Sequence, residues 1–247
     1  MKPLIKPLLL LVILNITACA EKTNKDVIAS IPEASGISFC QDSQTLVVAN
    51  DEGSFYELTD TGKILTEHKL GKHDLEGVVC EKDKFVFAVE DGALLEVDRK
   101  TLKTKKLKLK SQGFKYKLSK KAGIEGITKI DDLYYLSIQA KKKKDAKLLV
   151  VKLGANYAKV INVIDHGIID SAGMQFHDKK LYIVSDKKDK LYVYNLKKNK
   201  VSKEVKLPKF AQEGITFDDK GHVYFADDDG AVRKYFINKA LKLKKVQ

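Results

Sequence analysis

A short phrase centred on glycine occurs five times along the chain and constrains the fold more than any other feature. The copies are Ser35-Gly36-Ile37, Glu76-Gly77-Val78, Glu125-Gly126-Ile127, Ala172-Gly173-Met174 and Glu213-Gly214-Ile215. Their glycines are separated by 41, 49, 47 and 41 residues. A period in this range is typical of proteins built from one repeated supersecondary unit. The sequence therefore predicts a repeat architecture.

Each repeat contains the pattern of four short strands. In the last repeat, apolar-alternating runs at 215–217, 222–226 and 231–236 are separated by turns rich in Asp and Gly, and a Lys-rich run follows. Short runs of Val, Ile, Tyr and Phe bounded by such turns indicate strands joined by hairpins. Four strands in about 45 residues is the size of a β-propeller blade.

We therefore predict an all-β fold, a five-bladed β-propeller over residues 27–247, with six blades as the alternative. The segment Val27–Ile31 precedes the first phrase as an outer strand precedes the others, so it is predicted to complete the last blade and close the ring. Closure removes sheet edges that would otherwise aggregate. A β-sandwich with coincidental glycines is the competing interpretation.

Residues 1–18 have the pattern of a signal peptide. Lys2 and Lys6 precede the apolar stretch Leu8–Ile16, which is too short to span a bilayer. The phrase Ile16-Thr17-Ala18-Cys19 resembles a bacterial lipobox, which implies cleavage before Cys19 and acylation of that cysteine. An ordinary secretory signal is the alternative.

A lipid anchor at Cys19 would make residues 19–26 a short tether, and several acyl chains would hold the chain stably on a membrane. Residue 20 is Ala and not Asp. By the sorting rule of enteric bacteria, this implies the outer membrane, with the body of the protein in the periplasm.

Cys40 and Cys80 fall on the predicted inner strands of adjacent blades, in a compartment that permits disulfides. When the repeats are aligned on their glycines, Cys40 lies one position later than Cys80. Neighbouring positions on a strand point to opposite faces. This register favours two unpaired thiols, with Cys80 in the core, and leaves a disulfide as the alternative.

The formal charge is +13, and it is unevenly distributed. Eleven basic residues and no acid lie between Arg99 and Lys121, and further basic runs occupy 141–144 and 239–245. These runs map mostly to outer strands, where lysines keep sheet edges soluble. Contact with anionic lipid headgroups is the alternative interpretation. Nucleic acid is excluded as a partner, because no aromatic-and-basic module is present.

Acidic residues concentrate in the loops that enter the inner strands and in the turns between second and third strands, which share one face of a propeller. The residues predicted to bind a ligand there are Glu33, His73, Asp74, Glu90, Asp91, Asp170, Asp186, Asp227 and Asp228. Asp51, Glu52, Asp189 and Asp229 belong to the same turns.

Glu76, Glu125 and Glu213 precede their glycines at the predicted channel mouth, so they are expected to face one another. Three close carboxylates repel unless a cation, a cationic ligand or raised pKa values neutralise them. Calcium is the most natural cation, because it accepts carboxylate, carbonyl and water oxygens in flexible geometry. In the alternative interpretation each Glu caps backbone amides of its own blade.

The phrases "EASGISF", "HDLEGVV", "IEGITKIDDLYYLSIQ", "DSAGMQFHDKKLYIVSD" and "AQEGITFDDKGHVYFADD" resemble the SdiA-regulated family of bacterial propellers from about residue 27 onwards. The resemblance implies an envelope propeller without an established activity. More distantly, the chain is similar to esterase-like phytase and gluconolactonase propellers. In gluconolactonases a channel-mouth glutamate of an "EG" phrase binds a divalent metal, and Glu76, Glu125 and Glu213 match that phrase.

Three hypotheses for function follow. The first is a lipid-anchored, monomeric propeller that binds a divalent cation, or a cationic or metal-bridged ligand, at an acidic channel mouth. The second is a metal-dependent hydrolase of phosphate esters or lactones, in which the metal would activate water. The third is a protein-binding scaffold in the envelope. No catalytic residue is predicted.

Overall fold

The computed structural model describes residues 26–119, 123–238 and 241–246. The predicted signal peptide and the predicted lipidation site Cys19 lie outside these residues, as does the predicted tether up to residue 25. No α-helix occurs in the described ranges, which contain only the 3-10 turns η1 (Lys143–Asp145) and η2 (Asp186–Lys188). Accordingly, none of the described residues form a helix long and apolar enough to cross a membrane.

The strands form five antiparallel groups that follow the repeats. In chain order the strands are β1 (Val27–Ser30); β2 (Ala34–Cys40), β3 (Thr45–Asn50), β4 (Ser54–Thr59) and β5 (Ile64–Lys69); β6 (Leu75–Cys80), β7 (Lys84–Val89), β8 (Ala93–Asp98) and β9 (Thr104–Ser111); β10 (Ile124–Ile130), β11 (Leu133–Ile138), β12 (Lys147–Leu153) and β13 (Ala158–Asp165); β14 (Met174–His177), β15 (Lys180–Ser185), β16 (Lys190–Asn195) and β17 (Lys200–Lys206); β18 (Gln212–Phe217), β19 (His222–Asp227), β20 (Ala231–Ile237) and β21 (Leu243–Lys245). Parallel pairing of β9 with β13 joins the second and third groups into one eight-stranded sheet.

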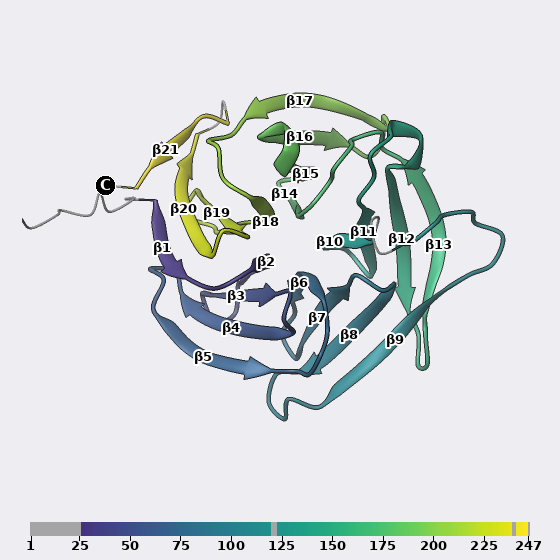
Figure 1. Cartoon of the computed structure of the whole chain (residues 1–247), viewed down its shortest axis with the longest axis horizontal. Coiled ribbons are helices and arrows are strands. Elements are labelled where there is room, and N and C mark those ends of the chain that lie inside the picture. Colours follow the sequence, from purple (N-terminus) through teal and green to yellow (C-terminus); the bar gives the residue numbers. More distant parts are fainter. Residues whose placement is uncertain (1–25, 120–122, 239–240, 247) are drawn as a thin grey trace, which may run out of the picture.

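The groups are arranged around a common centre, which confirms an all-β, propeller-like fold (Figure 1). The first strand of each group, namely β2, β6, β10, β14 and β18, lies nearest the centre. The last strands β5, β9, β13 and β17 lie outermost, and of these β9 and β17 are rich in lysine. This order places the glycine phrases at the middle of the molecule and the basic runs at its perimeter.

The two ends of the described chain meet on one strand. β1 pairs antiparallel with β20, as the sequence predicted, and β21 pairs with the same strand further along. Arg233 on β20 contacts the Asp26 carboxylate at 2.7 Å, and the Lys245 ammonium lies 2.5 Å from the same carboxylate. Asp26, the last residue of the predicted tether, is therefore buried and holds the ring closed.

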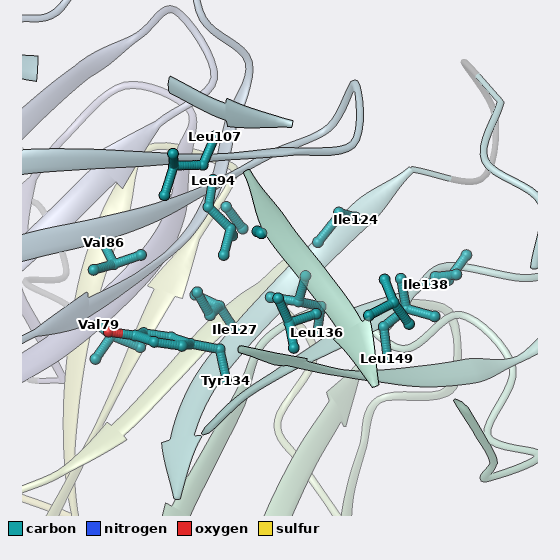
Figure 2. Close-up of a cluster of buried hydrophobic side chains, with 14 residues drawn as sticks. Val79, Val86, Leu94, Leu107, Ile124, Ile127, Tyr134, Leu136, Ile138 and Leu149 are labelled. Carbon is teal, nitrogen blue, oxygen red and sulfur yellow. The ribbon is translucent and has the colours of Figure 1, made fainter. Parts of the chain in front are cut away.

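The hydrophobic core formed by the described residues is divided into five clusters, each packed between two neighbouring groups. One cluster joins the second and third groups through residues such as Val79, Leu94, Ile127 and Leu136 (Figure 2). The other four lie between the first and second, third and fourth, fourth and fifth, and fifth and first groups. Each sheet therefore buries both faces, which explains why the inner and middle strands read as nearly continuous apolar runs.

The structure contains a disulfide between Cys40 and Cys80, so the prediction of two unpaired thiols was wrong. The two side chains do point to opposite faces of their own sheets. However, neighbouring groups pack with one face against the opposite face, so Cys40 of β2 and Cys80 of β6 meet within the same interface. The register of a single strand does not reveal this pairing, because the pairing depends on how neighbouring sheets face each other.

We expect the Cys40→Ser/Cys80→Ser variant to lose about 3–4 kcal/mol of unfolding free energy, because the bond closes a loop of 40 residues in the unfolded chain. Urea unfolding of the full chain, with and without reductant, measures this loss. A non-reducing digest should release one linked peptide pair containing both cysteines. Equal stability of oxidised wild type and variant would contradict the prediction.

Candidate cation site at the channel mouth

The five repeat glycines pack against one another around the centre. A Cβ on Gly36 would lie 2.5 Å from the Gly77 Cα, and one on Gly173 would lie 2.6 Å from the Gly214 Cα. Similar contacts link Gly77 to Gly126 and Gly126 to Gly173, and Gly214 approaches Ile37 of the first strand. The void enclosed at this level is about 10 Å³, room for about one water molecule. The inner strands therefore converge so closely that no side chain fits at these positions.

The residue before the glycine lies at a β-bulge in four of the five repeats. In each of these repeats the residue before the glycine has no partner on the neighbouring strand. The unpaired residues are Ser35 on β2, Glu76 on β6, Glu125 on β10 and Glu213 on β18. A bulge leaves its residue out of the hydrogen-bonded ladder and redirects its side chain. The bulges therefore direct the side chains of three glutamates away from the regular sheet, next to the point where the inner strands converge at the glycines.

Glu76 and Glu125 are more than nine-tenths buried, and Glu213 is half-buried. Burial and the nearby Glu125 and Asp51 carboxylates raise the pKa of Glu76. Burial and the neighbouring acids likewise raise the pKa of Glu125, and they raise the pKa of Glu213 to about 9. Within the described residues, neither Glu76 nor Glu125 has a hydrogen-bond or ion-pair partner for its carboxylate. Burial and mutual repulsion therefore favour the neutral, protonated form of these carboxyl groups unless a cation is bound.

Among the described residues, Asp51, Asp74 and Glu76 form a group of three carboxylates close enough to share one ion. One oxygen from each lies within 4.8 Å of the others. Asp51 Oδ1 is buried without a hydrogen bond, and burial together with Asp228 and Asp74 raises the pKa of Asp51. The sequence predicts that Asp51 lies on the acidic face, but Asp51 is not among the residues predicted to bind a ligand. It supplies a carboxylate in the repeat where Ser35 stands in place of glutamate.

The loops that enter the inner strands lie beside the turns between second and third strands, as the propeller geometry requires. The Glu90 N–H donates to the Asp74 carbonyl at 3.0 Å, and the Asp51 N–H donates to the Glu33 carbonyl at 3.3 Å. The Asp228 N–H donates to the Ala211 carbonyl in the same way. This pairing gathers the acidic loops and turns on one face around the centre.

Asp170 and Asp186 extend the acidic cluster on the fourth repeat. Asp170 is buried, and its carboxylate accepts hydrogen bonds from the Lys187 N–H at 2.8 Å and from the Lys187 ammonium at 2.7 Å. Burial and Asp170 raise the pKa of Asp186. Lys187 thus neutralises part of the cluster on this side, and Glu76 lies on the less compensated side.

Among the other residues selected from the sequence, some have structural partners, whereas the Glu90 and Asp228 carboxylates help to raise the pKa of Glu125 and of Glu213 respectively. Asp227 is fully buried and accepts from Arg233 Nε at 2.5 Å, so it belongs to the ring closure. Asp91 is exposed and pairs with Lys106 at 2.7 Å. His73 and Glu90 line an adjoining cavity of about 410 Å³, to which Asp74 also contributes, and burial lowers the pKa of His73. Glu33 and Asp228 are exposed at the rim.

The chemistry of this donor set suits a hard cation. The available ligands are carboxylate oxygens, and the buried glutamates have no cationic side chain of their own. Calcium takes six to eight oxygen ligands in flexible geometry, whereas zinc prefers nitrogen and sulfur. The residues present therefore fit calcium, with Asp51, Asp74 and Glu76 as the ligands that already lie together.

Comparison with known proteins places the chain in a family. A model of the SdiA-regulated family matches residues 18–228, and the chain therefore belongs to this family. A sequence comparison with curated proteins gives no match.

Among solved structures, the chain is similar to a glutaminyl cyclase from Myxococcus xanthus, with a TM-score of 0.65 and 10% identity. The similarity covers 90% of this chain and 95% of the cyclase. At this identity the likeness shows the fold alone.

The raised pKa values predict how stability depends on pH. A buried carboxyl whose folded pKa exceeds its unfolded value binds more protons in the folded state, so stability falls as pH rises between the two values. In metal-free buffer, we expect the melting temperature of the full chain to fall between pH 7 and pH 9, through the range of the Glu213 pKa.

The Glu76→Gln/Glu125→Gln/Glu213→Gln variant should have a flatter profile over the same range. A matched control replaces the exposed acids Asp132, Asp178 and Asp219, at turns between first and second strands, by Asn. This control should keep the wild-type slope. Identical slopes for all three proteins would show that the buried glutamates do not titrate in this range.

Proposed function

We propose that the chain is a lipid-anchored envelope propeller that binds a divalent cation, calcium first, or a cationic or metal-bridged ligand, at its acidic channel mouth. The observation that carries the proposal is the pair Glu76 and Glu125. Both are more than nine-tenths buried, and neither carboxylate has a partner in the described part of the chain. Burying charge without a partner is costly, so such carboxylates need a proton or a cation.

The neighbouring acids supply further oxygen ligands for a cation. Asp51 and Asp74 present carboxylate oxygens within 4.8 Å of one from Glu76, and Asp74 is exposed. A purely structural glutamate would bond to backbone amides of its own blade. Neither buried glutamate does so in the described residues. The exposed Asp74 gives the site a side open to solvent, through which an ion could enter.

We further propose that the ring has five blades, each made of one repeat. Two features support this count. The five glycines contact one another in chain order and return to the first strand. The five core clusters likewise link each group to the next and the last group to the first.

The hydrolase and scaffold hypotheses rank below cation binding. The metal that a hydrolase needs would occupy the same carboxylates, so the cation experiment also bears on that hypothesis. The likeness to the glutaminyl cyclase is at 10% identity and gives no reason to assign that enzyme's reaction to this chain.

Calorimetric titration of the full chain at pH 8 should show calcium binding. The Glu76→Gln/Glu125→Gln/Glu213→Gln variant should bind calcium about a hundredfold more weakly, equivalent to about 2.8 kcal/mol. Calcium should raise the wild-type melting temperature more at pH 8 than at pH 6, because the ligands must lose protons to bind.

The Asp132→Asn/Asp178→Asn/Asp219→Asn protein is the charge-matched control and should bind calcium like the wild type. If wild type and the glutamate variant show the same heats and the same melting temperatures with calcium, the cation site is wrong. If both triple variants weaken binding equally, the effect is one of overall charge and not of this site.

The proposed anchor is tested by replacing Cys19. In a bacterial host, the wild-type chain should incorporate labelled palmitate and sediment with the outer membrane. The Cys19→Ser chain should do neither, because it lacks the thiol to which the lipid would be attached. Palmitate labelling of Cys19→Ser, or an unlabelled wild type, would contradict the anchor.

A further inference from the structure

A second charged site of opposite sign lies in two loops of the third repeat. A cavity of about 660 Å³ is lined by residues 115–119, which lead into β10, and by residues 138–147, which connect β11 to β12 and include η1. The Gln139 N–H donates to the Gly123 carbonyl at 3.1 Å and ties the two loops together. The first loop leads into the inner strand of the repeat, and the second connects its second and third strands. Loops of these two kinds also carry the acidic residues, so the cavity opens on the same face as the acidic mouth.

Lysines dominate the lining of this cavity. Six of them contribute to it, namely Lys115, Lys117, Lys141, Lys142, Lys144 and Lys147. Lys147 pairs with Asp165, but in the described ranges the other five have no ion-pair partner. Asp145 is the single acid in the lining. The lysines therefore repel one another and produce a positive potential inside a concave surface, where the field is focused.

The same cavity has an apolar wall. Ile138 and Ala140 are buried, and Tyr116 is half-buried with its pKa raised by burial. All three line the cavity. Its volume falls in the range of small-molecule sites, about 300–1,000 Å³. A solvated lysine loop that serves only solubility has no need of such a wall, so the combination favours a ligand with both charged and apolar parts.

We propose that this cavity binds a phosphate-bearing amphiphile. A phosphate monoester carries nearly two negative charges and several acceptor oxygens, so it can engage more than one lysine at once, whereas a single carboxylate carries one charge. Lysine binds phosphate as a point charge and, unlike arginine, does not need a fixed two-pronged geometry. Lysines that approach a phosphate from two different loops can therefore bind it together. The apolar part of the ligand would lie against Tyr116 and Ile138.

This site is independent of the proposed cation site. It uses different residues, different loops and the opposite charge, so it would stand if calcium binding failed. Two sources could supply the ligand chemistry, a soluble organic phosphate or the headgroup of an anionic lipid. The experiment below separates them.

The test uses the full chain and hexyl phosphate in calorimetric titration at low salt, with inorganic phosphate for comparison. Hexyl phosphate should bind about tenfold more tightly than inorganic phosphate, because its chain buries apolar surface. Lys117→Gln/Lys142→Gln/Lys144→Gln should weaken hexyl phosphate binding about tenfold or more by removing three charges from both walls. These lysines form no ion pair in the described residues, and two of them lie outside regular strands and helices, so the variant should fold normally.

The charge-matched control is Lys197→Gln/Lys198→Gln/Lys200→Gln, on exposed residues in the turn between β16 and β17 and at the start of β17. It should bind hexyl phosphate like the wild type. No binding to the wild type, or an equal loss in both variants, would overturn the proposal.

Vesicles of phosphatidylcholine with phosphatidic acid identify the source of the ligand. If the cavity variant also loses vesicle binding and the control variant keeps it, the site takes lipid headgroups. If vesicle binding is the same in all proteins while hexyl phosphate binding depends on the cavity lysines, the site takes a soluble organic phosphate. Either result supports the proposal once the hexyl phosphate arm succeeds.

Discussion

The close approach of the five inner strands at the repeat glycines is the constraint on which the rest of the structure depends. A Cβ at Gly36 or Gly173 would lie 2.5 or 2.4 Å from backbone of the next strand, nearer than real Cβ atoms come. Only glycine permits this contact. The same contact fixes the position of the preceding residue, which lies on a bulge beside the constriction. One local requirement therefore sets both the convergence of the strands and the location of Glu76, Glu125 and Glu213.

Charge is separated radially as a consequence of this arrangement. Lysines are frequent on the outermost strands β9 and β17, where water solvates them, and the centre collects carboxylates in a confined space. Part of this central charge is balanced by Lys187 on Asp170, and Asp227 is balanced by Arg233. In the described part of the chain no lysine or arginine pairs with Glu76, Asp51 or Asp74, and burial together with the neighbouring acids raises the pKa of Glu76 and of Asp51. The carboxylates around Glu76 can therefore accept an ion, whereas Asp170 and Asp227 already form salt bridges with side chains of the protein.

Much of the fold could be predicted because it is local and repeated. The period of the glycines, the hairpin turns and the strand Val27–Ser30 on β20 all follow from pattern and turn chemistry. The disulfide could not be obtained from strand register alone, because it depends on how one sheet faces the next. The role of Asp227 depends on Arg233 and Asp26, which no short-range pattern connects. The place of Asp51 beside Glu76 could not be predicted from the sequence, because the two residues belong to different repeats and only the folded chain brings them together. The lysine cavity combines two loops that no repeat pattern describes.

The central claim is that a hard cation is held among the carboxylates at the channel mouth. The most direct measurement is the anomalous difference map of crystals of the full chain soaked in terbium(III), an oxygen-seeking substitute for calcium. The account predicts one strong peak within bonding distance of Glu76 and Asp51 or Asp74, and no such peak in Glu76→Gln/Glu125→Gln/Glu213→Gln crystals. A map without density at the mouth, with Glu76 and Glu125 bonded to backbone amides, would contradict it.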